Sequence, residues 1–427
     1  MQLKLRDRMN GAWLDRRRVR AAAIILLVLQ LGGFLFIAAG TQGWIVKLDK
    51  PTTTDFVSFY AAGALADAGT PALAYDHAAH LAAEERVTGA GIEYQFFNYP
   101  PVYLLPFAAL AALPYLVAFF VFEIGTLALY LLIASRILRD HSFTAFAVLL
   151  AFPMVFWNFG LGQNGFLTAA LFGAGTLLID RRPVVAGLLF GALCYKPQFA
   201  LLLPLALAAG GRWRAIAAAA VSAAALVLLS LALFGADSWQ AWLATAGNSP
   251  TMYQSGRILF AGMANIFGGA RLLGAGVMLS YALQAAVSLT AAAVVIIVWR
   301  RHLSLPTRAA TLAAASLVAA PLSLLYDLLL GVIAAAWLVR DRDAPAAGWE
   351  KIALAAVYLL LLDGRGLADG WHIPVFPLAA LAVFVLAGIR VWREMAERRS
   401  AVASDAVAVA SPYASSPGLT RGSGAAR

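Results

Sequence analysis

The sequence predicts an all-α polytopic membrane protein, a bundle of about twelve transmembrane helices with short amphipathic helices in the first outer loop. Of the 427 residues, 62% are hydrophobic and 13% are charged, whereas soluble domains carry about 25% charged residues. The apolar segments are about 15 to 25 residues long, which suits helices and not the alternating segments of about ten residues found in β-barrels. Because every backbone group inside a bilayer must be satisfied within the protein, helices are the predicted spanning elements.

Clusters of arginine separate the apolar segments and indicate their orientation. Short loops rich in Lys and Arg remain in the cytoplasm, so we place each cluster there, which accounts for the formal net charge of +10 without nucleic-acid binding. The clusters lie at 16–20, 136–139, 181–182, 212–214, 300–308, 340–342 and 390–399. The predicted spans run near 21–40, 115–137, 143–158, 165–180, 183–195, 197–210, 214–234, 273–299, 306–321, 323–340, 350–363 and 372–392. Both termini are then cytoplasmic.

The chain divides into a basic cytoplasmic N-terminus (1–20), a transmembrane domain (21–393) and a cytoplasmic tail (394–427). The tail is rich in Ala, Ser, Pro and Gly and is predicted to be disordered, because it cannot bury enough apolar surface to fold. Two outer segments, 41–114 and 235–272, are too long to be simple turns, and function is expected in them. In the first, aromatic and alanine residues recur at helical spacing, which predicts short helices at the membrane interface.

Polar residues collect at the predicted outer ends of the spans. A charge near hydrocarbon depth costs about 2.5 to 3.5 kcal/mol on insertion scales and usually marks a function or an ion pair. The arrangement therefore indicates a polar cavity that opens to the outside. Its candidate residues are Asp55, Asn98, Tyr99, Gln163, Asn164, Lys196, Gln198, Arg257, Asn265, Tyr326 and Asp327.

These side chains together suggest glycosyl transfer. A carboxylate such as Asp55 can act as a general base towards a hydroxyl group. The cations of Lys196 and Arg257 can hold the charge of a departing phosphate. Amides donate and accept hydrogen bonds as sugar hydroxyls require, and the candidates are Gln163, Asn164 and Gln198.

Each candidate also has a plainer interpretation. Asp55 follows three threonines and fits a helix cap or a loop residue. Lys196 fits an interfacial lysine that extends its ammonium towards water, and 162–165 (Gly-Gln-Asn-Gly) fits a tight turn between two spans. The pair Tyr326-Asp327 follows a proline and fits a helix start.

Three further titratable residues are assigned to structure. Glu123 lies inside an apolar span, and we expect it to pair with a neighbouring helix. His77 and His80 are expected to be solvated loop residues. The single cysteine, Cys194, allows neither a disulfide nor a metal site built from cysteines.

Five stretches of the sequence resemble one known family. In chain order they read DFVSFYAAGALADAGTPALAYD, FNYPPVYLLPFAAL, LGQNGFLTAALF, AGLLFGALCYKPQFALLLPLAL followed by GRWRA, and NIFGGARLL. Their order and spacing, from about residue 20 to about residue 340, resemble glycosyltransferase family 87 among the polyprenol-phosphate-sugar-dependent enzymes of the GT-C fold. The resemblance implies a GT-C-like helical bundle.

The family's chemistry is transfer of a hexose, often mannose, from a polyprenyl monophosphate to a glycan or glycolipid acceptor outside the membrane. By this resemblance Asp55 matches the general base, and one displacement inverts the anomeric carbon without a metal or other cofactor. Some relatives carry a histidine where this chain has Leu325, Tyr326 and Asp327. The implied partners are the lipid-linked donor, the acceptor and membrane lipid, with no nucleic acid. The implied location is the bacterial inner membrane, crossed several times, with the site facing the periplasm.

A multispan transporter or lipid flippase is the alternative from another class, and a structural membrane subunit is a third. A transporter is expected to have repeated halves with broken helices at the membrane midplane. Asp55, Lys196 and Tyr326 distinguish the alternatives, because an enzyme should gather them in one outward cavity and a carrier should scatter them.

Overall fold

The computed structural model describes residues 13–39, 41–42, 45–47, 51–52, 54–254, 258–340 and 348–410. This part of the chain is helical, as predicted, apart from a small antiparallel sheet that the sequence did not indicate. The sheet joins β1 (Thr41–Gln42), β2 (Ile45–Lys47) and β3 (Pro51–Thr52) directly after the first long helix.

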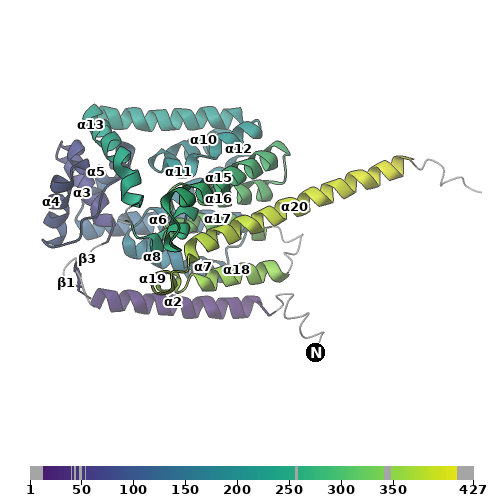
Figure 1. Cartoon of the computed structure of the whole chain (residues 1–427), viewed down its shortest axis with the longest axis horizontal. Coiled ribbons are helices and arrows are strands. Elements are labelled where there is room, and N and C mark those ends of the chain that lie inside the picture. Colours follow the sequence, from purple (N-terminus) through teal and green to yellow (C-terminus); the bar gives the residue numbers. More distant parts are fainter. Residues whose placement is uncertain are drawn as a thin grey trace, which may run out of the picture.

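Five helices are long and apolar enough to cross a membrane, so the chain is a multi-pass membrane protein. They belong to α2 (Arg16–Ala39), α6 (Tyr115–Leu138), α13 (Trp213–Gln254), α15 (Val277–Arg300) and α20 (Val375–Ala410). The pair α7 (Phe143–Leu150) and α8 (Pro153–Leu161), bent by 58°, makes a sixth if it is one span. In Figure 1, α2 and the first part of α13 run horizontally on opposite sides of the body.

The structure does not show the twelve predicted spans. Several of them are short helices: α9 (Gly165–Leu178), α10 (Pro183–Gly191), α11 (Pro197–Ala200), α12 (Leu203–Ala209), α16 (Leu305–Ala319), α17 (Leu329–Arg340) and α18 (Gly348–Leu360). The 15 residues of α16 extend about 22 Å at 1.5 Å per residue, less than the ~30 Å hydrocarbon core. Residues 307–319 of α16 are all buried in the protein, so its apolar composition reflects protein packing and not a lipid-facing span.

Short helices gather at the left end of the molecule in Figure 1. They are α3 (Phe56–Asp67), η1 (Pro71–Tyr75), α4 (His77–Thr88), η2 (Pro101–Tyr103) and α5 (Leu104–Ala111). The prediction of short helices in 41–114 is thus met, but α3 is buried on most of its surface and is not an interfacial amphipathic helix. It contacts α4 and α5, and a Cβ on Gly63 would lie 2.2 Å from the Phe107 carbonyl oxygen.

The second predicted outer loop, 235–272, is also largely helical. The long helix α13 continues to Gln254 but breaks at Gly235, whose φ of 73° and ψ of 167° are not helical. The part after the break descends along the left end in Figure 1. It is followed by η4 (Phe260–Gly262) and α14 (Ile266–Leu272).

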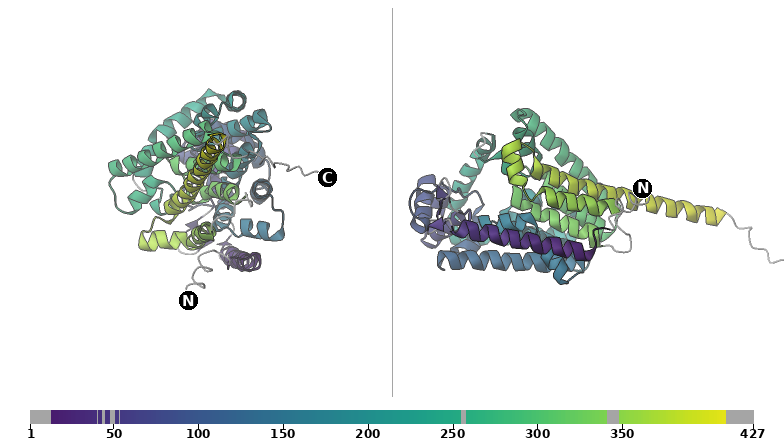
Figure 2. Two further views of the ribbon diagram at one scale, coloured as in Figure 1. Left: turned by 90° about the vertical axis from the view of Figure 1, so that its right-hand side faces the viewer. Right: turned by 90° about the horizontal axis from the view of Figure 1, so that it is seen from below.

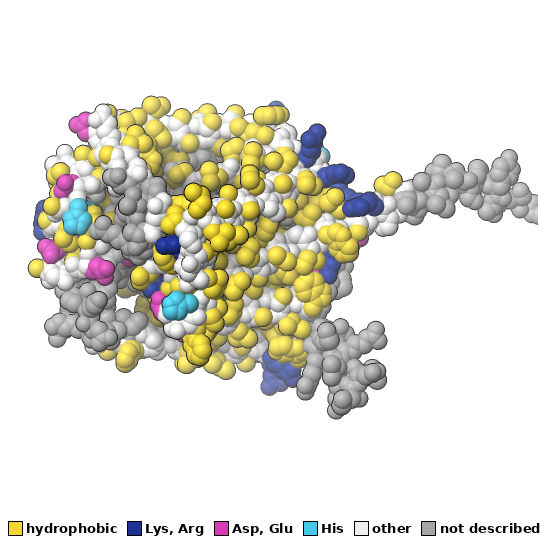
Figure 3. Space-filling view, viewed as in Figure 1, with side chains coloured by type: hydrophobic (Ala, Val, Ile, Leu, Met, Phe, Trp, Pro, Cys, Tyr) yellow, Lys and Arg dark blue, Asp and Glu magenta, His cyan; other side chains and the backbone are white. Residues whose placement is uncertain are grey.

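The opposite end of the molecule is rich in arginine. Figure 3 shows Lys and Arg side chains gathering at the right, while hydrophobic side chains cover the middle. The helix α20 leaves the body at this end (Figure 2). It remains helical to Ala410, so 394–410, predicted as the start of a disordered tail, forms a helix, and 411–427 lies outside the described residues.

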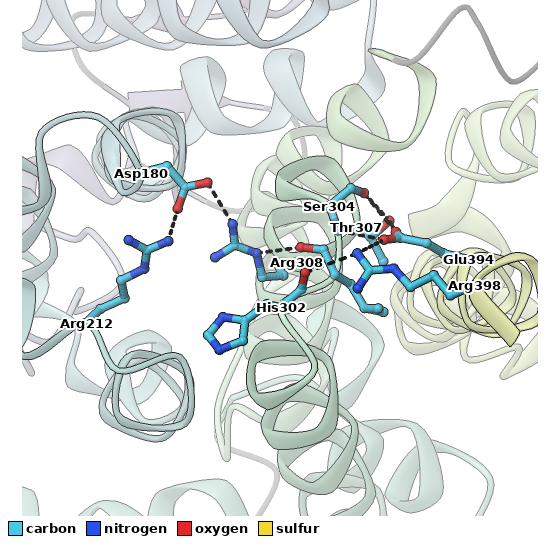
Figure 4. Close-up of polar contacts among 9 residues, drawn as sticks. Asp180, Arg212, His302, Ser304, Thr307, Arg308, Glu394 and Arg398 are labelled. Carbon is cyan, nitrogen blue, oxygen red and sulfur yellow. Dashed lines mark hydrogen bonds and ion pairs between the residues drawn. The ribbon is translucent and has the colours of Figure 1, made fainter. Parts of the chain in front are cut away.

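Ion pairs and hydrogen bonds join helices and the turns between them at the arginine-rich end (Figure 4). The Asp180 carboxylate accepts from Arg212 and from Arg308, the second at 2.7 Å. Glu394 of α20 accepts from the Ser304 backbone N–H at 2.7 Å and from the Thr307 hydroxyl at 2.6 Å. These contacts tie α16 to α20 and to the turns that follow α9 and precede α13, at the face predicted to be cytoplasmic.

Candidate active site

A cavity of about 490 Å³ brings together segments that are far apart in the sequence. Its walls come from the start of α3, the 95–100 segment before η2, the turn between α8 and α9, the second part of α13, and the 195–198 and 321–327 segments. Most of the predicted site residues line it: Asp55, Asn98, Tyr99, Gln163, Lys196, Gln198, Asn265, Tyr326 and Asp327. Arg257 lies outside the described residues.

Asp55 lies immediately before α3 and is half-buried. Its side chain makes no capping bond to the backbone of α3, which is described in full. Instead the Gln163 amide Nε2 donates to Asp55 Oδ2 at 2.8 Å. Burial raises the pKa of Asp55 to about 6, and the hydrogen bond from Gln163 opposes that rise. The carboxylate is therefore charged at neutral pH but more basic than usual, as a general base requires.

The turn that presents Gln163 is held by the side chain of Asn158. Its Nδ2 donates to the Gln163 carbonyl at 2.7 Å, and its Oδ1 accepts from the Gly165 backbone N–H at 2.8 Å. Gly162 has a φ of 69°, and a Cβ there would lie 2.5 Å from Cβ of Phe56. The segment 162–165 is thus a tight turn, and this turn also delivers a cavity residue next to Asp55.

Asn164 does not line the cavity. Its side chain is fully buried, and its Nδ2 donates to the Tyr103 hydroxyl at 3.0 Å. The Tyr103 ring stacks on Tyr195, with centroids 5.0 Å apart. Asn164 thus lies one layer behind the cavity wall, where it fixes an aromatic pair, and the structure does not place it at a substrate.

Lys196 and Asp327 form a buried ion pair in the cavity. The Lys196 Nζ donates to Asp327 Oδ1 at 2.7 Å, and both side chains are 3% exposed. The second oxygen of Asp327 accepts from the Leu324 backbone N–H at 2.9 Å. The ammonium also lies over the rings of Phe199 and Tyr326, 5.6 and 5.0 Å from their centroids. Lys196 is therefore not an interfacial lysine that reaches for water.

Other parts of the cavity wall are fixed by hydrogen bonds of backbone and side chains. The Trp242 indole Nε1 donates to the Asn98 carbonyl at 3.2 Å, and the Tyr75 hydroxyl donates to the Tyr99 carbonyl at 2.9 Å. Asn265 caps α14 by accepting from the Gly268 N–H at 3.0 Å. Its Nδ2 donates to the carbonyl of Pro321, so this side chain mainly holds the cavity wall.

A carboxylate, an ammonium and several amides in one cavity can carry out acid–base and phosphate chemistry on a polar substrate. Comparison with known proteins gives the family of the chain. The model of glycosyltransferase family 87 matches residues 96–326, more than half of the 427 residues. The chain belongs to glycosyltransferase family 87. No curated protein and no solved structure matches it.

The matched region of this membrane glycosyltransferase contains the cavity residues from Asn98 to Tyr326. Asp327 is the residue directly after the match, and Asp55 lies well before its start at residue 96. Both nevertheless line the same cavity as the matched residues. The structure therefore joins to the family region two carboxylates that the match does not cover.

Glu123 of the glycosyltransferase pairs with a neighbouring helix, as expected. The Asn158 Nδ2 on α8 donates to Glu123 Oε2 on α6 at 3.3 Å. Because Asn158 also holds the turn that presents Gln163, Glu123 supports the site from inside the bundle.

In the described part of the chain, no three His, Cys, Asp or Glu side chains gather as a metal site needs.

His80, expected to be solvated, is fully buried behind the cavity. Its Nε2 donates to the Ser58 carbonyl at 3.0 Å, and its Nδ1 lies 3.7 Å from Glu84 Oε1. Glu84 Oε2 accepts from the Gln95 backbone N–H at 3.2 Å. Burial raises the pKa of Glu84 to about 8 and lowers the pKa of His80 to about 4. Both are therefore mainly neutral at pH 7, and they link two segments that line the cavity.

Sequence reasoning also missed several aromatic side chains of the cavity, among them Trp242. The signal was present, since two tryptophans, Trp239 and Trp242, stand in a segment assigned to the outer side. The Trp239 Nε1 donates to Ser230 at 3.2 Å across the break in α13. Its ring meets that of Trp242 at a centroid distance of 5.6 Å. Aromatic residues that are fixed by hydrogen bonds beside a polar cavity indicate a binding site better than aromatic content alone does.

Proposed function

We propose that this glycosyltransferase moves a hexose, with mannose as the favoured sugar, from a polyprenyl monophosphate to an acceptor hydroxyl. The acceptor is a glycan or a glycolipid on the periplasmic face of a bacterial inner membrane. The observation that carries the proposal is the presence of Asp55 and Lys196 in one cavity. A base and a cation are the two charges that a displacement at a sugar phosphate needs.

The proposed reaction is one displacement. Asp55 takes the proton of the acceptor hydroxyl while that oxygen attacks the anomeric carbon and the bond from that carbon to the phosphate oxygen breaks. The polyprenyl phosphate leaves with one more negative charge, which the Lys196 ammonium stabilises. Gln163 holds the Asp55 carboxylate by the 2.8 Å hydrogen bond. A displacement without a covalent sugar–enzyme intermediate inverts the anomeric carbon.

The arginine-rich end supports the proposed orientation. Arginines in short loops resist translocation and stay in the cytoplasm. The short helices α3 to α5 gather at the other end of the body (Figure 1), and Asp55 lies immediately before α3. This polarity supports a periplasmic cavity, where a lipid-linked donor would present its sugar.

The transporter alternative receives less support. A carrier was expected to scatter its polar residues over a midplane path, whereas Asp55, Lys196 and Tyr326 line one cavity. Membership of a glycosyltransferase family points the same way. We therefore propose the enzyme alone.

Transfer of label tests the proposed function. The purified protein, in lipid nanodiscs, is supplied with radiolabelled polyprenyl-phosphate hexoses and membrane extract, with Asp55→Asn as the matched control. We expect a labelled product with the wild type and none with Asp55→Asn, because an amide keeps the shape but accepts no proton. Near-wild-type turnover by Asp55→Asn would refute Asp55 as the base. Failure of every labelled donor would refute the donor class.

A further inference from the structure

The described charged residues that line the cavity do not by themselves favour an anionic donor. Among its lining residues in the described part of the chain, the charged ones are Asp55, Lys196 and Asp327. With all three ionised, their formal charges add to minus one. A sugar phosphodiester brings another negative charge, and the departing lipid phosphate brings two.

The one cation of this set already has a partner. Asp327 Oδ1 lies 2.7 Å from the Lys196 Nζ, and the pair is almost fully withdrawn from solvent. Aromatic rings of Phe199 and Tyr326 cover further sides of the ammonium. A phosphate oxygen therefore cannot approach Lys196 closely without competing with the Asp327 carboxylate.

We infer that Asp327 stands in for the donor phosphate. It is an internal counter-ion of Lys196 that the lipid phosphate must displace. The ion pair between Asp327 and Lys196 forms again when the lipid phosphate product leaves. This inference rests on the proposed function and adds a positioning residue to it. Asp327 acts through Lys196 and limits how tightly the site holds a lipid phosphate.

The hydrogen bonds of Asp327 fit such a role. Its Oδ2 is held by the Leu324 N–H at 2.9 Å, so the carboxylate keeps one bond if Oδ1 gives up Lys196. A buried ammonium that loses its counter-ion is costly, and an incoming anion removes that cost. An Asp327→Asn variant leaves Lys196 without a charged partner while the amide oxygen still accepts from Leu324. Its site should bind a lipid phosphate more tightly than the wild type does.

Direct binding tests the inference without turnover. The probes are farnesyl phosphate and uncharged farnesol, titrated by calorimetry into the detergent-solubilised full-length protein. We expect Asp327→Asn to bind farnesyl phosphate about tenfold more tightly, the order of effect of one charged hydrogen bond, with farnesol binding unchanged. Damage to the fold would weaken binding and would not tighten it for the phosphate alone.

Two matched variants separate the ion pair from net charge. Asp55→Asn also removes one negative charge from the cavity but leaves Lys196 paired with Asp327, so the gain should be much smaller. Lys196→Met should abolish the preference for farnesyl phosphate over farnesol. Asp327→Ser, whose hydroxyl can still accept from Leu324, should repeat the tightening if Asp327→Asn does not fold.

Equal or weaker phosphate binding by Asp327→Asn and Asp327→Ser overturns the inference, and so does an equal gain in Asp55→Asn. In those cases the proposed function stands, because the wild type still binds the lipid phosphate. If neither the wild type nor any variant binds farnesyl phosphate, the proposed donor fails and the inference fails with it.

Discussion

At the scale of single residues, a buried carboxylate is tuned by one amide. Burial raises the pKa of Asp55 to about 6, and the Gln163 hydrogen bond limits the rise. A base works only when it is unprotonated, so activity that depends on Asp55 should rise through about pH 6 and level off above it. Burial therefore raises the lower edge of the working pH range, and Gln163 keeps it from rising further.

Replacing Gln163 by Leu should move that edge. The variant loses the 2.8 Å hydrogen bond to the carboxylate, which stabilises the charged form, so the pKa of Asp55 should rise further. We expect the rise of kcat/KM with pH to shift to higher pH by up to about one unit. The matched control is Gln198→Leu, which removes another cavity amide and should change activity without shifting the profile. A Gln163→Leu profile identical to that of the wild type would contradict the assignment.

Most of the candidate site could be predicted from the sequence, because a polar residue near an apolar span is conspicuous. Asp55, Lys196 and Asp327 were singled out for that reason, and they share one cavity. His80 could not be assigned in this way. It stands in a segment of mixed composition, and it is buried by the packing of α4 on α3 and by the rings of Tyr94 and Phe97. Sequence spacing gives the face of a helix but not the partner that covers it.

At the scale of elements, α4 supports the site through an uncharged pair. Glu84 and His80 are joined to the backbone of Gln95 and Ser58, which lie on two different walls of the cavity. The raised pKa of Glu84, about 8, and the lowered pKa of His80, about 4, keep both neutral near pH 7. The helix therefore connects the walls without adding charge beside Asp55.

The Glu84→Gln variant should become more stable than the wild type as pH rises. An unfolded Glu ionises near its ordinary pKa of 4.5, whereas the folded one keeps its proton to about pH 8. Between these values the unfolded state binds fewer protons, so this residue lowers the free energy of unfolding as pH increases. In the Glu84→Gln variant the free energy of unfolding does not fall for this reason. The Tm of the variant minus the Tm of the wild type should therefore grow from pH 5 to pH 8 and then stay constant.

Differential scanning fluorimetry in detergent measures this trend. The control is Glu93→Gln, which removes an exposed carboxyl nearby. An exposed carboxyl has similar surroundings before and after unfolding, so this control should show no growing advantage. A Tm difference for Glu84→Gln that does not change with pH would show that Glu84 is ionised in the folded protein.

At the scale of the whole molecule, the two ends differ: one is rich in arginine, and the other carries the cavity. The arginines that predicted the topology do gather at one end, where Asp180 binds Arg308 and Glu394 binds Arg398 (Figures 3 and 4). The number of spans was not predictable from hydropathy, because α16 is apolar through burial in protein. Composition cannot distinguish a helix enclosed by other helices from one enclosed by lipid.

The orientation can be tested with single cysteines at exposed positions, in a background with Cys194 replaced. Ala68 follows α3 and Asp237 follows the break in α13, and both are exposed near the end that carries the cavity. His302 is exposed in the arginine-rich loop after α15. Cysteines at 68 and 237 should react with a membrane-impermeant thiol reagent on intact cells, and a cysteine at 302 only after permeabilisation, because arginine-rich loops are not translocated. The reverse pattern would place Asp55 in the cytoplasm, away from a periplasmic acceptor. Reaction of only one of the first two would instead separate α3 from the second part of α13 and contradict the shared cavity.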